Sequence, residues 1–175
     1  MDFSVSHAVQ LLERTPRVLI AWLDGLDDTW THSRYGGGTF SPYHVVGHLI
    51  IGEREDWIAR AKRILAHGTS LAFDPFPHVA TIEPEDGGPL RGLLDEFARL
   101  RRANLDELKR MELTMEKLSL RGLHPAFGEV TLGQLLATWA THDVHHIGQI
   151  AKAMAYQYKD AVGPWRAYLN ILPQG

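Results

Sequence analysis

The 175-residue chain contains no cysteine, and this absence excludes every kind of site that needs a thiol. It can form no disulfide framework, thiolate nucleophile, cysteine-ligated zinc site or iron–sulfur cluster. Any chemistry with a borderline or soft metal must therefore use imidazole. The length suits one compact domain that buries a core without disulfides, and we expect a single domain over residues 1–175.

Excess positive charge and long apolar runs are also missing. The formal net charge of -3 gives no sequence-wide attraction to nucleic acid or to an anionic membrane. The apolar runs are only a few residues long, and the first residues, MDFSVSHAVQ, include an acid instead of a basic segment. These features predict neither a transmembrane helix nor a signal peptide. We expect a cytoplasmic protein without nucleic-acid or membrane partners.

The spacing of apolar residues is that of helices, and it predicts an all-α bundle of four long segments. These segments are 4–27, 41–67, 90–111 and 131–160. The charged face of the third segment is expected to be solvated. Between the second and third lies a proline-rich stretch, 69–89, which we interpret as a long crossover. A turn-rich stretch precedes the fourth helix, and a short tail follows Gly163.

Local signals mark several helix ends. Pro16 lacks an amide hydrogen and should interrupt the first segment. Ser41 precedes Pro42 in the pattern of a helix start, and Gly68 is suited to end the same helix. Thr131-Leu132-Gly133-Gln134 has the pattern of a capping box, so the last helix is expected to begin there.

The chain contains ten histidines, and four of them form His-x-x-x-His pairs. The pairs are His44/His48 and His142/His146, whose members lie one turn apart on one helix face and can reach one ion. Chance alone gives roughly 0.6 such pairs in a chain of this composition. The spacing therefore leaves two interpretations open, a metal site or histidines that are hydrogen-bonded to their neighbours. A ferritin-like di-iron site is excluded because no Glu-x-x-His pair is present.

Two segments carry a resemblance to a known family. HPAFGEVTLGQLL at 124–136, followed by WATHDVHHIGQI at 139–150, resembles the C-terminal signature of the DinB-like superfamily. Gly47-His48-Leu49, with Glu53 and Trp57 after it, resembles the second-helix motif of that family. The resemblance implies a four-helix bundle of the DinB/YfiT type with a long crossover between the second and third helices and a short C-terminal tail.

The resemblance also implies a metal site made of His48, His142 and His146. Nickel and zinc are the ions expected there, because neutral imidazoles suit such borderline ions. His44 matches no ligand position of the family and is a candidate neighbour of the site, and His145 should point elsewhere.

Five further residues have an expected place at the surface, near the site or in the core. Glu55 is expected at the surface or lining the pocket, and Asp143 either orients a ligand histidine or lies at the surface. Gln149 is expected to hydrogen-bond within the core, where Trp57 and Trp139 pack. The remaining histidines, His7, His32, His67, His78 and His124, receive no role.

The function that follows from this resemblance is that of a metal-dependent enzyme acting on a small molecule. It would be a hydrolase or a transferase that uses a low-molecular-weight thiol, with the ion as Lewis acid or as activator of water or thiol. The alternative is a non-catalytic metal-binding or stress-response protein, in which all ligand positions are closed. A homodimer is expected because dimers are common in the family.

Overall fold

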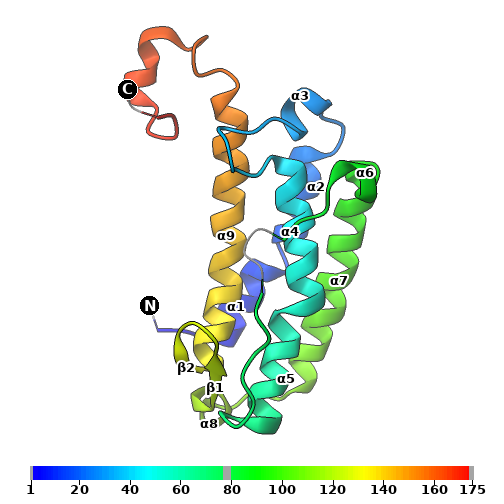
Figure 1. Cartoon of the computed structure of the whole chain (residues 1–175), viewed down its shortest axis with the longest axis vertical. Coiled ribbons are helices and arrows are strands. Elements are labelled where there is room, and N and C mark those ends of the chain that lie inside the picture. Colours follow the sequence, from blue (N-terminus) through cyan, green and yellow to red (C-terminus); the bar gives the residue numbers. More distant parts are fainter. Residues whose placement is uncertain (1, 77–79, 174–175) are drawn as a thin grey trace.

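The computed structural model describes residues 2–76 and 80–173, and its long helices lie side by side along the longest axis of the molecule (Figure 1). The long segments are α1 (Val5–Leu12) with α2 (Thr15–Leu23), α4 (Pro42–Glu55) with α5 (Trp57–His67), α7 (Leu90–Arg110) and α9 (Leu132–Tyr156). Shorter elements are α3 (Asp28–Thr31), α6 (Pro84–Gly87), α8 (Met115–Ser119) and a 3-10 helix (Gly163–Tyr168). The predicted four-helix architecture is confirmed. His78 lies outside the described residues.

The first segment is interrupted at the predicted proline, and a distant arginine stabilises the break. Pro16 has no amide hydrogen to offer to the carbonyl oxygen of Leu12, four residues before it. Arg101 on α7 takes that place, since its NH1 group donates to the Leu12 oxygen at 2.8 Å. The break between α1 and α2 is thus tied to the centre of the bundle.

The second segment is not the continuous helix that was expected over 41–67. Its start is as predicted, because the Ser41 hydroxyl caps α4 and Pro42 occupies the first turn. The helix is broken at Asp56, whose backbone angles are φ -104 and ψ -76. The side-chain amide of Asn104 donates to the Glu53 carbonyl oxygen at 2.7 Å, which is the acceptor that a continuous helix reserves for the amide of residue 57. A contact from α7 therefore accompanies the break.

The crossover from α5 to α7 lies against α4. Gly47 makes this approach possible, since a Cβ atom there would come within 2.6 Å of the Ile82 backbone nitrogen. The hydroxyl of Thr81 donates to the His44 carbonyl oxygen at 2.7 Å. The expected crossover is confirmed, with the short helix α6 near its end. Its contact with α4 brings backbone carbonyls of the crossover beside the histidine-bearing face.

The turn-rich stretch before α9 forms a small hairpin that the sequence analysis did not predict. Strands β1 (Arg121–His124) and β2 (Gly128–Thr131) pair antiparallel. Gly122 packs tightly on α5, where a Cβ would lie 2.6 Å from Ile64. The capping box of Thr131 and Gln134 then starts α9 as expected. Beyond Tyr156 the last turns tighten into i to i-3 hydrogen bonds, so the helix ends before the expected Asp160.

Apolar side chains fill the bundle in two clusters, one toward each end. The cluster nearer the hairpin includes Leu12, Trp57, Ile64, Leu132, Leu136 and Trp139. The cluster nearer α3 and α6 includes Leu19, Val46, Ile50, Leu94, Phe97 and Ile150. Among the described residues, no helix combines the length and apolar character needed to span a membrane.

Candidate metal centre

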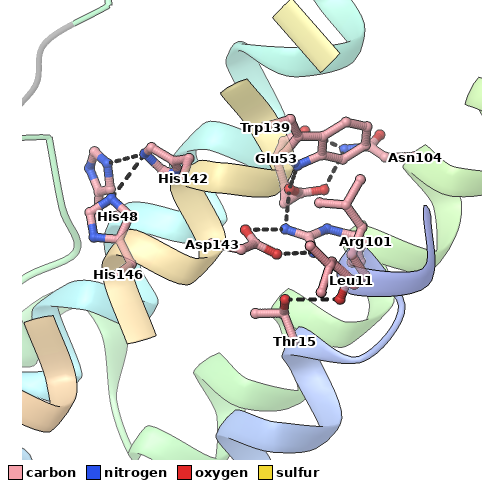
Figure 2. Close-up of polar contacts among 11 residues, drawn as sticks. Leu11, Thr15, His48, Glu53, Arg101, Asn104, Trp139, His142, Asp143 and His146 are labelled. Atoms are coloured by element: carbon pink, nitrogen blue, oxygen red, sulfur yellow. Dashed lines mark hydrogen bonds and ion pairs between the residues drawn. The ribbon is translucent and has the colours of Figure 1, made fainter. Parts of the chain in front are cut away.

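Three histidines from two helices converge on one point of the bundle wall. His48 projects from α4, and His142 and His146 project from α9 (Figure 2). The Nε2 atom of His142 lies 3.2 Å from His48 Nε2 and 2.9 Å from His146 Nε2. These residues form the one group of potential ligands found close together in the described part of the chain. The structure thus brings together the three residues that the resemblance selected.

The ring orientations of His48 and His146 are set by acceptors outside the cluster. His48 Nδ1 donates to the Ala80 carbonyl oxygen at 2.7 Å, and His146 Nδ1 donates to Gln149 Oε1 at 2.8 Å. A proton on Nδ1 leaves the lone pair of a neutral imidazole on Nε2. Both lone pairs therefore face His142, which is the arrangement that metal-ligating histidines commonly have.

The cluster fits a cation better than a set of hydrogen bonds. A neutral His142 carries one proton and cannot donate well from Nε2 to both facing lone pairs. Its Nδ1 is buried, and no described residue hydrogen-bonds to that atom. Ligand nitrogens at about 2.1 Å from one ion lie about 3.0–3.4 Å apart for angles of about 90–110°. The observed spacings of 2.9 and 3.2 Å are close to this range.

Burial keeps the imidazoles of His142 and His146 neutral. It lowers the pKa of His142 to about 2, with the neighbouring imidazoles of His146 and His48 adding to the effect. Burial likewise lowers the pKa of His146 to about 3, again with help from His48. Because a metal binds the deprotonated ring, these side chains are in the ligand form at neutral pH.

The other histidine candidates on the same helices do not belong to the cluster, although His145 lines the same cavity. His44 Nδ1 lies 2.5 Å from Ser41 Oγ, and its Nε2 lies 3.1 Å from Glu83 Oε2. His44 therefore belongs to the helix cap and the crossover. His145 is exposed, and its Nε2 is paired with Gln149 Nε2 at 3.1 Å. Gln149 thus orients a cluster histidine, a role that the sequence analysis did not assign to it.

The two acidic candidates, Glu55 and Asp143, lie in different surroundings. Glu55 is exposed at the end of α4, as one of the two interpretations expected. Among the described residues, Asp143 forms no hydrogen bond with a histidine of the cluster and pairs with Arg101 instead. Its oxygens lie 2.5 and 2.9 Å from the two terminal nitrogens of that guanidinium. Neither alternative considered for Asp143 is correct, because the residue is buried in an ion pair.

A buried ionic network lies beside the histidines (Figure 2). Arg101 NH2 also donates to Glu53 Oε1 at 2.9 Å. Glu53 accepts further hydrogen bonds from Trp139 Nε1 at 2.9 Å and from the side-chain amide of Asn104 at 3.0 Å. Arg101 was expected on a solvated face, but its side chain is 2% exposed. The network joins α4, α7 and α9, and so holds together the helices that carry the histidines.

The cluster forms part of the wall of a cavity of about 500 Å³. Aromatic side chains make up much of the lining, namely Phe40, Trp57 and Phe76. Trp57 meets the His142 ring edge to face at 5.0 Å and stacks on the buried Trp139 at 6.1 Å. Trp139 is core, as expected, whereas Trp57 both packs in the core and faces the cavity.

Two charged residues of the cavity wall were not identified from the sequence. Asp56, at the helix break, is 6% exposed, and its Oδ1 lies 2.6 Å from Arg60 Nε. Burial raises the pKa of the Asp56 carboxyl to about 6, although Arg60 acts in the opposite direction. An acid followed four residues later by arginine is a common surface pair on helices. The sequence therefore contains no signal that would have identified this one as buried.

Comparison with known proteins places the chain in a family. The family model of the DinB superfamily matches residues 11–150. Among solved structures, the fold is similar to that of YfiT from Bacillus subtilis, described as a probable metal-dependent hydrolase with an unusual four-helix bundle topology. That match has a TM-score of 0.73 and 22% sequence identity, and covers 91% of this chain and 87% of YfiT. A search of curated proteins gave no significant match. The chain belongs to the DinB superfamily.

Proposed function

We propose that this protein is a divalent-metal-dependent hydrolase of small molecules, with His48, His142 and His146 as the metal ligands. The observation that carries the proposal is the convergence of three Nε2 atoms at a cavity wall, with 3.2 and 2.9 Å between neighbours. The description of the similar YfiT structure as a probable metal-dependent hydrolase supports the reaction class.

The cavity favours an enzyme over a closed structural metal site. A structural site surrounds its ion with protein ligands, whereas a catalytic site keeps a position open toward substrate. Here the described residues supply three imidazoles, and the cluster faces a space of about 500 Å³. A volume of this size is typical of pockets for small ligands.

Neighbouring residues of the chain orient the three histidine rings. Ala80 and Gln149 hold the rings of His48 and His146 through their Nδ1 atoms, and Trp57 packs against His142. When bound, a divalent ion supplies Lewis acidity, which polarises a carbonyl and makes water or a thiol more acidic at neutral pH. Three neutral ligands leave its full positive charge available.

Nickel or zinc is the ion that we propose, because imidazole suits both and the chain has no thiolate to add selectivity. A low-molecular-weight thiol is retained as a second substrate to be tested, since the protein has no cysteine nucleophile of its own. The cytoplasmic location and the homodimer remain predictions from the sequence.

The metal assignment is tested by measuring bound metal. The protein is purified without chelator, loaded with zinc or nickel and analysed by mass spectrometry of the metal, beside His48→Ala, His142→Ala and His146→Ala. We expect near-stoichiometric metal in the parent and a large loss in each variant. His44→Ala is the matched control, because it removes a buried histidine one turn from His48 that has other partners. Equal metal content in the parent and in the three cluster variants would contradict the ligand assignment.

The reaction class is tested separately on the metal-loaded protein. A panel of chromogenic esters and amides is assayed with and without an added low-molecular-weight thiol. Metal-dependent hydrolysis that is lost in His142→Ala supports the hydrolase, and turnover that needs the thiol supports the transferase instead. Full metal occupancy with a fourth protein ligand closing the site, as seen by X-ray absorption, would favour the non-catalytic alternative.

A further inference from the structure

A charged pair, Asp56 and Arg60, forms a second polar region in the wall of the cavity that the histidines share. The helix break at Asp56 removes this residue from the regular surface of α4 and buries its carboxyl group. Arg60 follows one turn later on α5, with its side chain 12% exposed. Neither residue takes part in the proposed metal centre or in the network around Arg101.

The guanidinium of Arg60 is held in a defined position. Its Nε lies 2.6 Å from Asp56 Oδ1, and its NH2 donates to the Asp74 carbonyl oxygen at 3.2 Å. The Phe73 ring packs 5.1 Å from its central carbon. These described contacts leave further N–H groups of the fork for a ligand. An arginine fixed in this way loses little side-chain entropy when it binds an anion.

Apart from its histidines, the described lining of the cavity holds one acidic and one basic side chain, so a bound divalent ion would make its net charge positive. Asp56 is the one carboxylate among the described lining residues, and Arg60 is charged at every relevant pH. A divalent ion at the histidine cluster would add positive charge to the same space. The aromatic rings of Phe40, Trp57 and Phe76 provide an apolar surface beside it. The cavity thus offers a cation for a carboxylate and an aromatic wall for the body of the same molecule.

We propose that Arg60, positioned by Asp56, is the recognition site for the carboxylate of a small monocarboxylate with an apolar body. That this molecule is the substrate rests on the proposed function, whereas its binding to Arg60 does not. The arrangement lets one end of the ligand bind Arg60 while its body extends along the aromatic wall toward the histidines.

The experiment measures binding of benzoate and of the uncharged benzamide by titration calorimetry, first on metal-free protein. We expect the parent to bind benzoate more tightly than benzamide. Arg60→Met should weaken benzoate about tenfold to a hundredfold, the range for loss of a charge-assisted hydrogen bond, and leave benzamide unchanged. Arg63→Met is the matched control on the same helix, since Arg63 pairs with the exposed Asp74 and does not line the cavity. It should leave benzoate binding unchanged.

Asp56→Asn gives an independent test, because the Asp74 carbonyl oxygen and the Phe73 ring still contact Arg60 in this variant. Removal of the carboxylate leaves the guanidinium charge uncompensated, so benzoate should bind the variant more tightly than the parent. Equal affinity of the parent for benzoate and benzamide, no loss in a folded Arg60→Met, or an equal loss in Arg63→Met would each overturn the proposal. Circular dichroism confirms that each variant is folded.

Repeating the titration with zinc-loaded protein separates this proposal from the proposed function. If benzoate binds only when zinc is present and Arg60→Met has no effect on its affinity, the result would overturn the Arg60 site without contradicting the metal centre. If benzoate binding depends on Arg60 but the protein takes up no metal, the result would support the Arg60 site and contradict the metal-dependent function.

Discussion

Asp56 carries a buried carboxyl whose ionisation is costly to the folded protein. The residue is 6% exposed, and burial raises its pKa from an ordinary 3.8 to about 6, against the opposing effect of Arg60. Asparagine has a similar shape and no charge, so Asp56→Asn removes the cost of burying the charge. We expect the variant to gain stability relative to the parent as the pH is raised toward neutrality.

The direction and size follow from the linkage of proton binding to folding. As the pH rises from about 4 to about 6, the unfolded chain has released the proton while the folded chain still holds it. The parent therefore becomes less stable over this range, and the loss persists above it. The gap between 3.8 and about 6 corresponds to roughly 3 kcal/mol in the free energy of unfolding.

The assay is urea denaturation of the metal-free parent and Asp56→Asn at several pH values between about 4 and 7. The difference between the two proteins cancels the titration of groups that they share, and the attraction of Arg60 for the ionised carboxylate is already contained in the folded pKa of about 6. The slope of the difference is therefore the tested quantity.

Asp74→Asn is the control for this slope. Asp74 is exposed, and its hydrogen bond with Arg63 lowers the pKa of its carboxyl, so its stabilising effect is present above the ordinary pKa and is lost as the pH falls. Between about pH 4 and 7 the difference between the parent and Asp74→Asn should therefore be nearly flat, in contrast to the slope for Asp56. A stability difference between parent and Asp56→Asn that is flat with pH, or that moves in favour of the parent as pH rises, would refute the reasoning.

Three further changes test the structure around the site. Arg101→Met should lower the free energy of unfolding by about 3–5 kcal/mol in urea denaturation, because two buried carboxylates lose their ion-pair partner. Arg99→Met, which removes an exposed ion pair, should lower it by no more than about 1 kcal/mol, and equal losses in the two variants would contradict the network. Gln149→Leu should weaken zinc binding about tenfold to a hundredfold in a chelator competition, since the His146 ring loses its acceptor, and an unchanged affinity would remove that role. Gly148→Ala should stabilise the protein by about 1 kcal/mol in thermal denaturation, because alanine favours the helix more than glycine and its Cβ would meet nothing within 4 Å at this exposed position. A loss of stability would contradict this open surrounding of Gly148.

Features that depend on residues near each other in the chain were predictable. Pro16 cannot continue the preceding helix, because its amide hydrogen is missing, and it lies instead in the first turn of α2. Ser41 and the Thr131–Gln134 capping box act on amides within three residues, so the starts of α4 and α9 appear where the sequence placed them. The long crossover followed from its prolines and the absence of a helical period.

Features that depend on contacts between helices were missed. The break at Asp56 accompanies a hydrogen bond from Asn104, and nothing in the local sequence indicates that partner. Arg101 lies in a charged stretch and has the same composition around it as its exposed neighbours, yet it is buried because Glu53 and Asp143 meet it from two other helices. Asp56 and Arg60 were overlooked for the same reason.

The sequence by itself determined which chemistry was open to this protein. Without cysteine, only imidazole and oxygen ligands remained, and the spacing of His142 and His146 placed two of those imidazoles on one helix face. Only the tertiary structure decided which histidine completes the group. His44 and His48 have equivalent spacing in the sequence, but α9 and the Ala80 carbonyl meet His48, while Ser41 and Glu83 occupy His44. That choice depends on contacts between segments far apart in the chain, which no local pattern encodes.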